Sequence, residues 1–374
     1  MIIGIDASRA NQPKKTGVGW YSYYLIEELK KIITDNQNQF FLYTHQPLRG
    51  DLARLPQNWQ EKILDWWPKY LWTKIRFSWE MLRRKPDVLF IPSHVMPKFS
   101  PKKTVMTVHD LGYERYPEVY SKFARNYLRK NYRFAAQHAV KIITPTEFTK
   151  KELISLYHIK SEKVEIVSMA YNDKIFRKID DNKKINDVLK KYKIKKPYLL
   201  FVGRLETKKG LQTLLKAFTL IPNNLITNNS ITLNLVLAGG RGYGYKDLKP
   251  LISDLKSVKE LGYLKNESDR AVLYNAAEIF VFPSLYEGFG IPLLEAMACG
   301  TPVIASNIET LKEVGGDSAQ FFKVGEAEDL AKKIKEVLED HELRQKMIRR
   351  GSEHVKNFSW QKCAEKTLKI LENL

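Results

Sequence analysis

The chain has 374 residues, of which 44% are hydrophobic and 28% charged, and its formal net charge at pH 7 is +20. This length exceeds one ordinary hydrophobic core and predicts two domains, whereas two cysteines are too few for a disulfide framework or a metal cage. No apolar run is long enough to span a membrane and the first residues lack the pattern of a signal peptide, so we expect a cytoplasmic protein.

Short apolar runs alternate with helical patterns along the chain. In the first half, the predicted strands are residues 2–5, 39–43, 88–91, 104–108 and 141–144, and the predicted helices are residues 20–31, 71–84 and 120–138. In the second half, the predicted strands are residues 198–202, 232–238, 279–283 and 303–305, and the predicted helices are residues 211–218, 268–277, 292–299, 343–355 and 360–374. Apolar strands that alternate with helices predict an α/β protein with two doubly wound parallel sheets.

A polar stretch rich in Lys, Asp and Asn separates the two halves. Such composition is typical of a connection between domains. We therefore expect an N-terminal domain over residues 1–175, a linker over 176–196 and a C-terminal domain over 197–358, followed by a helical segment over 359–374.

The run Ser-Leu-Tyr-Glu-Gly-Phe-Gly-Ile-Pro-Leu-Leu-Glu, residues 284–295, is the most informative part of the chain. It joins a predicted buried strand to a predicted helix, so Gly288 and Gly290 let the backbone N–H groups at the helix start approach an anion closely. Glu287 stands before the helix and Glu295 lies one turn inside it. Carboxylates repel phosphate but accept hydrogen bonds from hydroxyl groups, so the pattern indicates a ligand with both phosphate and sugar.

Glu287 and Glu295, with Gly288, Phe289 and Gly290 between them, resemble the paired-glutamate signature of retaining glycosyltransferases of family 4. The simpler alternative is a turn between strand and helix whose glutamates are solvated or cap the helix. The resemblance implies the GT-B fold, in which two Rossmann-like domains face each other across a cleft. It also implies that the first domain binds the acceptor, the second binds the nucleotide sugar, and the last helix crosses back to the first domain.

A second loop, Gly-Arg-Leu-Glu-Thr-Lys-Lys-Gly over residues 203–210, follows the first predicted strand of the second half. Cleavage of a bond between a sugar and a diphosphate leaves negative charge on the phosphate, so cations at this place lower the barrier. The family resemblance assigns Arg204 and Lys209 to the diphosphate. No Asp-x-Asp occurs in the chain, so we expect no bound metal and no other cofactor.

The family resemblance assigns further residues to the donor. Gly262, Tyr263 and Leu264 correspond to a segment beside the nucleotide base, Glu295 is expected to accept hydrogen bonds from ribose hydroxyls, and Glu287 is expected to contact the transferred sugar.

In the first half, His109 and Asp110 follow a predicted strand, at the end of a parallel sheet where such sheets bind ligands. The pair resembles a His-Asp motif of the family in which the histidine contacts the transferred sugar, although a histidine at a strand end can also be a satisfied core group. Gly17 and Gly19 are expected to form a loop before helix 20–31 that approaches the donor phosphate or the acceptor.

Residues 59–85 hold five of the seven tryptophans, interleaved with Lys and Arg. On a helix, Trp72, Ile75, Trp79 and Leu82 form one stripe, which fits either core packing or an interfacial membrane face. The residues up to 180 include 31 Lys and Arg against 18 Asp and Glu, compared with 31 against 24 in the remainder. Anionic lipid, nucleic acid and phosphorylated substrates are all attracted by such charge.

Taken together, the residues and the resemblance predict transfer of a sugar from a nucleoside-diphosphate donor to an acceptor hydroxyl with retention of configuration. The best match is mannose from GDP-mannose, transferred to a lipid-linked glycan or a surface polysaccharide precursor, with the anionic inner face of the cell membrane as a further candidate partner. The alternatives are a GT-B phosphorylase, a nucleotide-sugar epimerase, or a basic nucleic-acid-binding protein without enzymatic activity. We expect no nucleic acid as a partner, since that alternative leaves the glutamate motif without a purpose.

Overall fold

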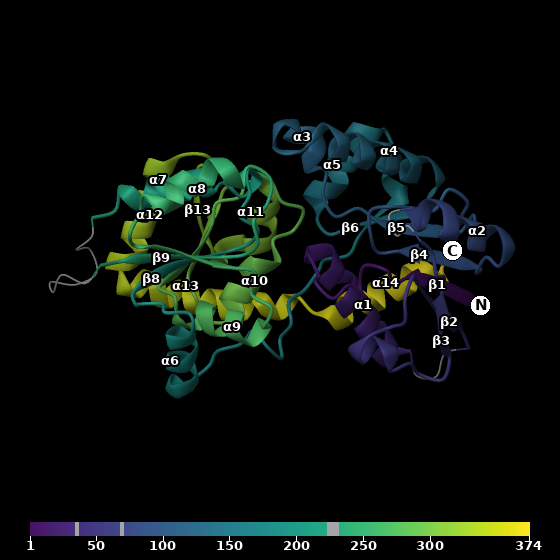
Figure 1. The fold of residues 1–374 in the computed structure, drawn as a ribbon, viewed down its shortest axis with the longest axis horizontal. Helices are drawn as coiled ribbons and strands as arrows, with labels where there is room; N and C mark the ends of the chain where they lie inside the picture. Colours follow the sequence, from purple (N-terminus) through teal and green to yellow (C-terminus); the bar gives the residue numbers. More distant parts are fainter. Residues whose placement is uncertain (34–36, 68–70, 223–231) are drawn as a thin grey trace. The chain divides into compact units, whose positions relative to one another are not determined.

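The computed structural model describes residues 1–33, 37–67, 71–222 and 232–374. The chain divides into two compact units (Figure 1). Unit 1 contains Met1–Pro117, Ser121–Met169 and Ser359–Leu374, and unit 2 contains Glu118–Tyr120 and Ala170–Phe358. Each unit is built on one fully parallel sheet with helices beside it, as the alternation of apolar strands and helices predicted.

Unit 1 has a seven-stranded sheet in the order β3-β2-β1-β4-β5-β6-β7. The strands are β1 Ile2–Asp6, β2 Gln39–Thr44, β3 Trp59–Ile63, β4 Val88–Ile91, β5 Thr104–Thr107, β6 Lys141–Thr144 and β7 Val164–Ile166. The helices are α1 Gly17–Ile32, α2 Ser78–Arg83, α3 Gly112–Arg115, α4 Lys122–His138, α5 Glu147–Tyr157 and α14 Trp360–Glu372.

The C-terminal helix α14 packs against α1 within unit 1. The ring of Trp360 stacks on that of Tyr24 with centroids 5.5 Å apart, and it also contacts Tyr21 at 6.0 Å. The buried side chains of Cys363 and Leu371 continue this apolar face. The last helix of the chain is therefore part of the core of the unit that contains the N-terminus.

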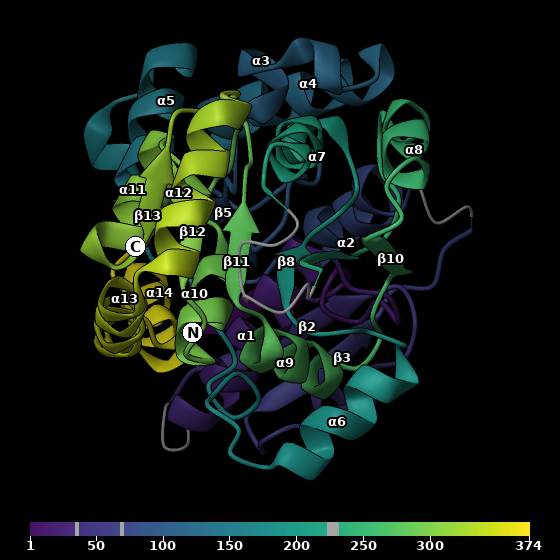
Figure 2. The ribbon, with the colours of Figure 1, turned by 90° about the vertical axis from the view of Figure 1, so that its left-hand side faces the viewer.

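Unit 2 has a six-stranded sheet in the order β10-β9-β8-β11-β12-β13. The strands are β8 Tyr198–Val202, β9 Asn234–Ala238, β10 Val258–Gly262, β11 Ile279–Phe282, β12 Val303–Ser306 and β13 Gln320–Phe322. The helices are α6 Asn182–Lys191, α7 Leu211–Thr219, α8 Tyr245–Ser253, α9 Glu267–Ala276, α10 Ile291–Ala298, α11 Glu309–Gly315, α12 Ala327–Glu339 and α13 His341–His354. Helix α7 packs against α8 and α12, and α10 packs against α9 and α13, so helices cover both faces of the sheet (Figures 1 and 2).

The predicted strands are all interior strands, whereas the four strands that the sequence did not reveal are the four sheet edges, β3, β7, β10 and β13. Interior strands such as β4 and β11 are buried at every residue and read as apolar runs. The edge strand β10 is only half-buried at each of its residues, which are Val-Lys-Glu-Leu-Gly. An edge strand needs no continuous apolar sequence, so periodicity alone does not identify it.

The expected linker, residues 176–196, contains the helix α6. Its Val188 and Leu189 are buried, and Lys191 forms an ion pair with Asp269 of α9 at 2.6 Å. The outer face of α6 is rich in Lys and Asn, and this polarity produced the linker-like composition. The segment belongs to unit 2.

The tryptophan-rich segment, residues 59–85, contains strand β3 and, where a helix was predicted over residues 71–84, a helical stretch over residues 73–83. Trp59 lies in β3 and stacks on Phe40 with ring centroids 4.6 Å apart, while Trp72 is buried and donates its indole N–H to the Leu64 carbonyl at 2.7 Å. The helical part consists of a π-helical turn, η3 Thr73–Phe77, followed by α2. Residues 68–70 of this segment lie outside the described residues. Core packing therefore accounts for Trp59 and Trp72.

Two loops of unit 2 approach each other closely at Gly210, the residue before α7. Its φ is +64°, and a Cβ atom there would lie 1.9 Å from the carbonyl oxygen of Pro283, just after β11. Gly325 has a similar φ of +83° but open space around it. Alanine substitutions at Gly210 and Gly325 therefore separate two contributions to stability, namely the free-energy cost of the left-handed backbone and that of steric overlap.

We expect Gly325→Ala to lower the free energy of unfolding by about 1–2 kcal/mol, because the left-handed backbone disfavours a Cβ atom. Gly210→Ala is expected to cost a further 1–3 kcal/mol, roughly, because the loops must also move apart. Urea denaturation of both variants measures the difference. Equal losses would contradict the close approach of the two loops.

Candidate functional site

Each sheet has a point at which the order of its strands reverses. In unit 2, β9 and β10 extend the sheet on one side of β8, and β11 begins the other side. In open parallel sheets, ligands bind beyond the carboxyl ends of the strands at such a switch point. The loops after β8 and β11 are the two that carry the sequence motifs, residues 203–210 and 284–290. The fold therefore brings both motifs together at the carboxyl ends of two neighbouring strands of one sheet.

The loop after β11 places Glu287 beside Lys209. The Lys209 ammonium forms an ion pair with Oε1 of Glu287, and Ser284 donates its hydroxyl to the same oxygen at 2.6 Å. Thr310 of α11 donates to the backbone carbonyl of Glu287 at 2.9 Å. Both charged side chains are mostly buried, so the pair has a single well-supported geometry.

Arg204 differs from Lys209 in its surroundings. Its side chain is 58% exposed, and among the described residues it forms an ion pair with Glu206 alone, at 3.5 Å. A partly exposed guanidinium keeps most of its donors for a ligand, whereas one donor of Lys209 is already used by Glu287. Of the two predicted cations, Arg204 is the more available to a diphosphate.

Glu295 lies inside α10 and is buried. Its Oε1 accepts from the Arg270 guanidinium at 2.9 Å, and its Oε2 accepts from the Tyr274 hydroxyl at 3.0 Å. Arg270 also pairs with Glu267 at 2.8 Å. Burial raises the pKa of the Glu295 carboxyl, and the neighbouring Arg270 opposes this rise. Each carboxylate oxygen retains one acceptor lone pair for a further donor.

The glycine loop ends at Gly290, which precedes α10 with a φ of +105°. A Cβ atom at this position would lie 2.8 Å from Leu311, so both the backbone conformation and the space favour glycine. The intervening Phe289 is buried and meets Phe358 edge to face at 5.9 Å. Pro292 takes the second position of α10, where it has no hydrogen bond to lose.

The segment expected beside the base lies at the end of the edge strand β10. Gly262 has a φ of +70° with open space around it, so glycine serves the backbone turn there rather than a close contact. Tyr263 is partly exposed and Leu264 is buried. Since β10 pairs with β9, this segment lies at the same carboxyl edge as the two motif loops.

In unit 1, His109 follows β5 and is buried. Its Nε2 lies 2.9 Å from the Pro92 carbonyl oxygen, and because a carbonyl only accepts, Nε2 carries the hydrogen. Burial lowers the pKa of His109, so the neutral ring is favoured and Nδ1 is an acceptor. The neighbouring Asp110 accepts from the Gly112 backbone N–H at 3.1 Å.

Gly17 and Gly19 lie in the first turn of α1, rather than in the loop before it as the sequence suggested. A Cβ atom at Gly17 would meet nothing within 4 Å, and one at Gly19 would lie 3.2 Å from the Arg9 carbonyl oxygen. The pair therefore presents backbone at a helix N-terminus, which is a favourable position for an anion.

Comparisons with known proteins agree with this geometry. The family described as Glycosyltransferase Family 4 matches residues 16–173, and the family described as Glycosyl transferases group 1 matches residues 182–354. The O-antigen chain mannosyltransferase B of Escherichia coli is 30% identical over 297 residues, which are 78% of this chain and 76% of that protein. The chain belongs to the family 4 glycosyltransferases.

Solved structures show the same fold for this glycosyltransferase. Sucrose-phosphate synthase from Thermosynechococcus elongatus superposes with a TM-score of 0.76 at 21% identity, covering 100% of this chain and 98% of the other. Anabaena HepE in complex with UDP-glucose superposes with a TM-score of 0.74 at 17% identity, covering 100% and 99%. The expected GT-B fold and the assignment as an enzyme are confirmed, and a non-enzymatic nucleic-acid-binding protein is not favoured.

Sequence reasoning identified Lys209, as a cation for the diphosphate, but it did not find the other residues that hold the two glutamates of the glycosyltransferase. Ser284, Arg270 and Tyr274 were not identified, although Arg270 and Tyr274 are four residues apart on one helix face, a spacing that can present two donors together. In unit 1, the switch point between β1 and β4 holds the buried Asp6, whose Oδ1 accepts from the Ser8 backbone N–H at 2.9 Å. Burial raises the pKa of Asp6.

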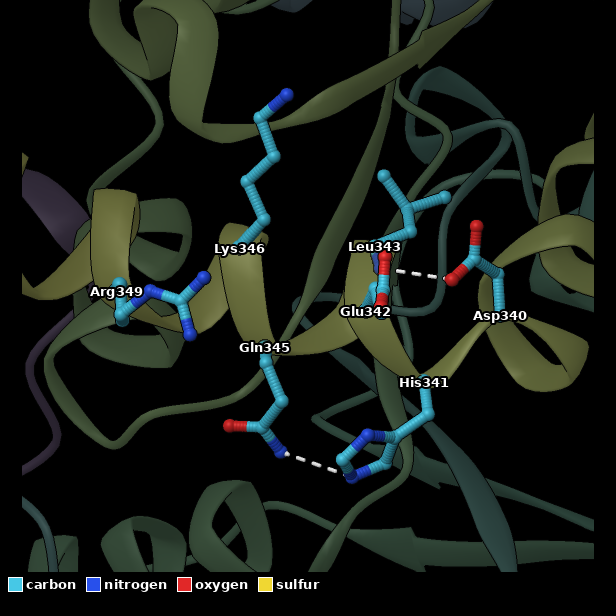
Figure 3. A pocket seen from close by; sticks show the side chains of 7 residues that line it. All are labelled: Asp340, His341, Glu342, Leu343, Gln345, Lys346 and Arg349. Atoms are coloured by element: carbon cyan, nitrogen blue, oxygen red, sulfur yellow. Dashed lines mark hydrogen bonds between the residues drawn. The ribbon is translucent and has the colours of Figure 1, made fainter.

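A surface hollow lies elsewhere in unit 2, along helix α13 (Figure 3). Its lining comes from one helix and its N-cap, Asp340, which accepts from the Leu343 backbone N–H at 2.9 Å. None of the motif residues lines this hollow.

Within the residues that the structure describes, no group of three or more His, Cys, Asp or Glu side chains is placed so that it could hold a metal ion.

The Arg270–Glu295 contact predicts a pH-dependent effect on stability. Arg270→Met leaves Glu295 buried without its cation, and breaking a buried pair in this way costs about 3–5 kcal/mol. Because the raised pKa of Glu295 favours protonation in the folded state, this loss is smaller at low pH and grows as the pH rises through the folded-state pKa. The free energies of unfolding of variant and wild type are compared at pH 5 and at pH 7.5.

The double variant Arg270→Met with Glu295→Gln serves as the control. It should recover a substantial part of the loss at pH 7.5 and reduce the difference between the two pH values. A pH-independent loss without recovery would show that Arg270 acts through packing on Phe176, whose ring centroid lies 4.9 Å from its guanidinium.

Proposed function

We propose that this glycosyltransferase transfers mannose from GDP-mannose to a hydroxyl group of a lipid-linked glycan or surface polysaccharide precursor, with retention of configuration. The observation that carries the proposal is the 30% identity to an O-antigen chain mannosyltransferase over three quarters of both chains, combined with the grouping of Arg204, Lys209, Glu287 and Glu295 at one sheet edge. The UDP-glucose named for HepE supports a nucleotide sugar as the donor class.

In this proposal, different residues of unit 2 bind the diphosphate, the ribose and the sugar of the donor. The Arg204 guanidinium and the remaining donors of Lys209 face the diphosphate, where negative charge grows as the bond to the sugar breaks. Backbone N–H groups at the start of α10 add a fixed positive potential. Glu295 accepts from the ribose hydroxyls through its remaining lone pairs. Glu287, oriented by Lys209 and Ser284, accepts from hydroxyls of the sugar.

In unit 1, the proposal assigns His109 and Asp110 to the sugar that is transferred. The Nδ1 atom of the neutral His109 ring can accept a hydrogen bond from a sugar hydroxyl.

The hydroxyl group of the acceptor substrate attacks the sugar from the face that the diphosphate leaves. The sugar C1–oxygen bond to phosphate breaks, the bond to the acceptor oxygen forms, and the acceptor proton passes to a departing phosphate oxygen, so no protein nucleophile is required.

Among the described residues, no helix has both the length and the apolar character needed to cross a membrane. We propose a cytoplasmic location at the inner face of the cell membrane, where a lipid-linked acceptor would be presented.

Donor identity is tested by thermal shift with GDP-mannose, GDP and UDP-glucose, because a bound donor stabilises the folded state.

A transfer assay with GDP-mannose and a mannosylated acceptor then tests the reaction by release of GDP. Formation of a glycosidic product with retained configuration supports transfer. Production of a sugar phosphate or of an epimerised nucleotide sugar would instead indicate a phosphorylase or an epimerase. Stabilisation by UDP-glucose alone would overturn the assignment of the donor.

Substitutions of the two glutamates are expected to impair different steps of the reaction. Glu295→Gln should mainly weaken binding of the nucleotide, and Glu287→Gln should mainly lower kcat, each by about tenfold or more, because a hydrogen bond to a charged group contributes about 1.5–3 kcal/mol. Steady-state kinetics and calorimetric titration with GDP measure both effects. Glu309→Gln, at an exposed carboxylate of α11, is the matched control and should change neither. Wild-type donor affinity and rate in both test variants would contradict the assignment of this loop.

The cationic site is expected to work without a divalent metal. Transfer should persist in EDTA, whereas Arg204→Gln should lose about tenfold or more in kcat/KM because a charge-assisted contact to the diphosphate is removed. Arg54→Gln, at an exposed arginine paired with Asp51, is the control. Loss of activity in EDTA that is reversed by Mg²⁺ or Mn²⁺ would contradict this prediction.

A further inference from the structure

The helical segment η3–α2 of unit 1 is apolar on two opposite faces. The inward face carries Phe77 and Met81, which are buried, and Phe77 stacks on Trp72 with ring centroids 4.8 Å apart. The outward face carries Ile75, Trp79 and Leu82, which are 43%, 53% and 52% exposed. A helix that only packs on a sheet has one apolar face and one polar face, so the outward face is not explained by folding of unit 1.

The outward face continues directly into a run of cations. Arg83, Arg84 and Lys85 follow Leu82 and are all exposed, and within the described part of the chain no carboxylate is in ion-pairing distance of them. Arg83 also lies over the Trp79 ring, 5.8 Å from its centroid. By contrast, Arg76 is paired with Glu80 at 2.9 Å. The unpaired positive charge therefore collects at the end of α2, beside the exposed tryptophan and leucine.

The partner that fits this chemistry is a surface with anionic groups on the outside and an apolar interior, as in an anionic lipid bilayer. Tryptophan favours the boundary between lipid headgroups and acyl chains, while Arg and Lys side chains bind anionic headgroups. The residues up to 180, which form most of unit 1, also carry the larger share of the net positive charge of the chain. Figure 1 shows α2 at the outer edge of unit 1.

We propose that the outward face of η3–α2, comprising Ile75, Trp79 and Leu82 with Arg83, Arg84 and Lys85, docks unit 1 on an anionic lipid bilayer. Its biological purpose rests on the proposed function, since a transferase acting on a lipid-linked acceptor gains encounters by resting on the membrane. The apolar side chains enter the headgroup boundary and the three cations bind lipid phosphates. Because the charges are few and exposed, binding is reversible and weakens at high salt.

The experiment is flotation of the full chain with vesicles of phosphatidylcholine alone or with 30% phosphatidylglycerol. The wild type should bind the anionic vesicles at least tenfold more strongly, with most binding lost in 0.5 M salt. Trp79→Ser with Leu82→Ser, and separately Arg83→Glu with Arg84→Glu, should each weaken binding at least tenfold. Equal binding to neutral and anionic vesicles, or wild-type binding by both variants, would overturn the proposal.

Two control variants in unit 2 match these changes in chemistry. Leu220→Ser with Leu251→Ser removes leucines that are 48% and 42% exposed, and Lys246→Glu with Lys249→Glu reverses two exposed charges on α8. Both controls should bind vesicles within about twofold of wild type. Losses equal to those of the α2 variants would indicate a general effect of charge or hydrophobicity and overturn the assignment of the surface.

Two further measurements distinguish membrane docking from self-association and from a loss of activity. Light scattering without vesicles tests whether α2 instead joins two copies of the chain, and a change of oligomeric state in the α2 variants alone would overturn membrane docking. Transfer to a water-soluble acceptor should be equal in wild type and the α2 variants. Active protein that does not bind vesicles disproves only the docking, whereas vesicle binding without any transfer disproves the proposed function.

Discussion

The backbone after β8 passes so close to the Pro283 carbonyl oxygen that only a glycine fits at position 210. This contact holds the loop after β8 against the loop after β11 at the point where the order of the strands in unit 2 reverses. Lys209 immediately precedes this glycine, and its ammonium therefore meets the carboxylate of Glu287 from the other loop. In the proposed function, the diphosphate needs cations and the sugar needs hydrogen-bond acceptors, and this backbone contact holds a lysine and a glutamate together at the carboxyl end of the sheet.

The two glutamates of the motif are both buried, yet different partners hold them. Glu287 is paired with a lysine from the loop after β8 and accepts from a serine of its own loop. Glu295 is held by an arginine and a tyrosine that project from α9, one helix away. Removing a carboxylate from water is unfavourable unless ionic and hydrogen-bonding partners replace the solvent, so each partner is needed for stability as well as for orientation. In the proposed function, partners that already hold both carboxylates in place reduce the entropy that donor binding would cost.

The two units carry different kinds of chemistry. Unit 2 has the mostly buried ion pairs Lys209–Glu287 and Arg270–Glu295, whereas unit 1 has exposed aromatic and basic side chains on α2 and a buried histidine, whose pKa is lowered by burial, at the end of β5. The proposed reaction, with a water-soluble donor and a lipid-linked acceptor, needs one polar donor site and one surface that can contact a membrane. The distribution of charge along the chain, with the larger positive excess before residue 180, agrees with this division.

The sequence alone determined the class of fold and the interior strands, because buried strands read as apolar runs. It also singled out the residues that are proposed to contact the donor, because a glycine loop between two glutamates has few structural uses. It did not reveal the edge strands β3, β7, β10 and β13, since half-buried strands lack a continuous apolar pattern. Tertiary structure decided which tryptophans belong to the core: Trp59 and Trp72 are buried, while Trp79 is exposed on the same short segment. It also decided which distant groups support the glutamates, because Arg270 becomes a partner of Glu295 only when α9 packs on α10, and Lys209 becomes a partner of Glu287 only when the loops after β8 and β11 meet. Local sequence reports propensity and burial, whereas contacts between residues far apart in the chain depend on how the strands are ordered.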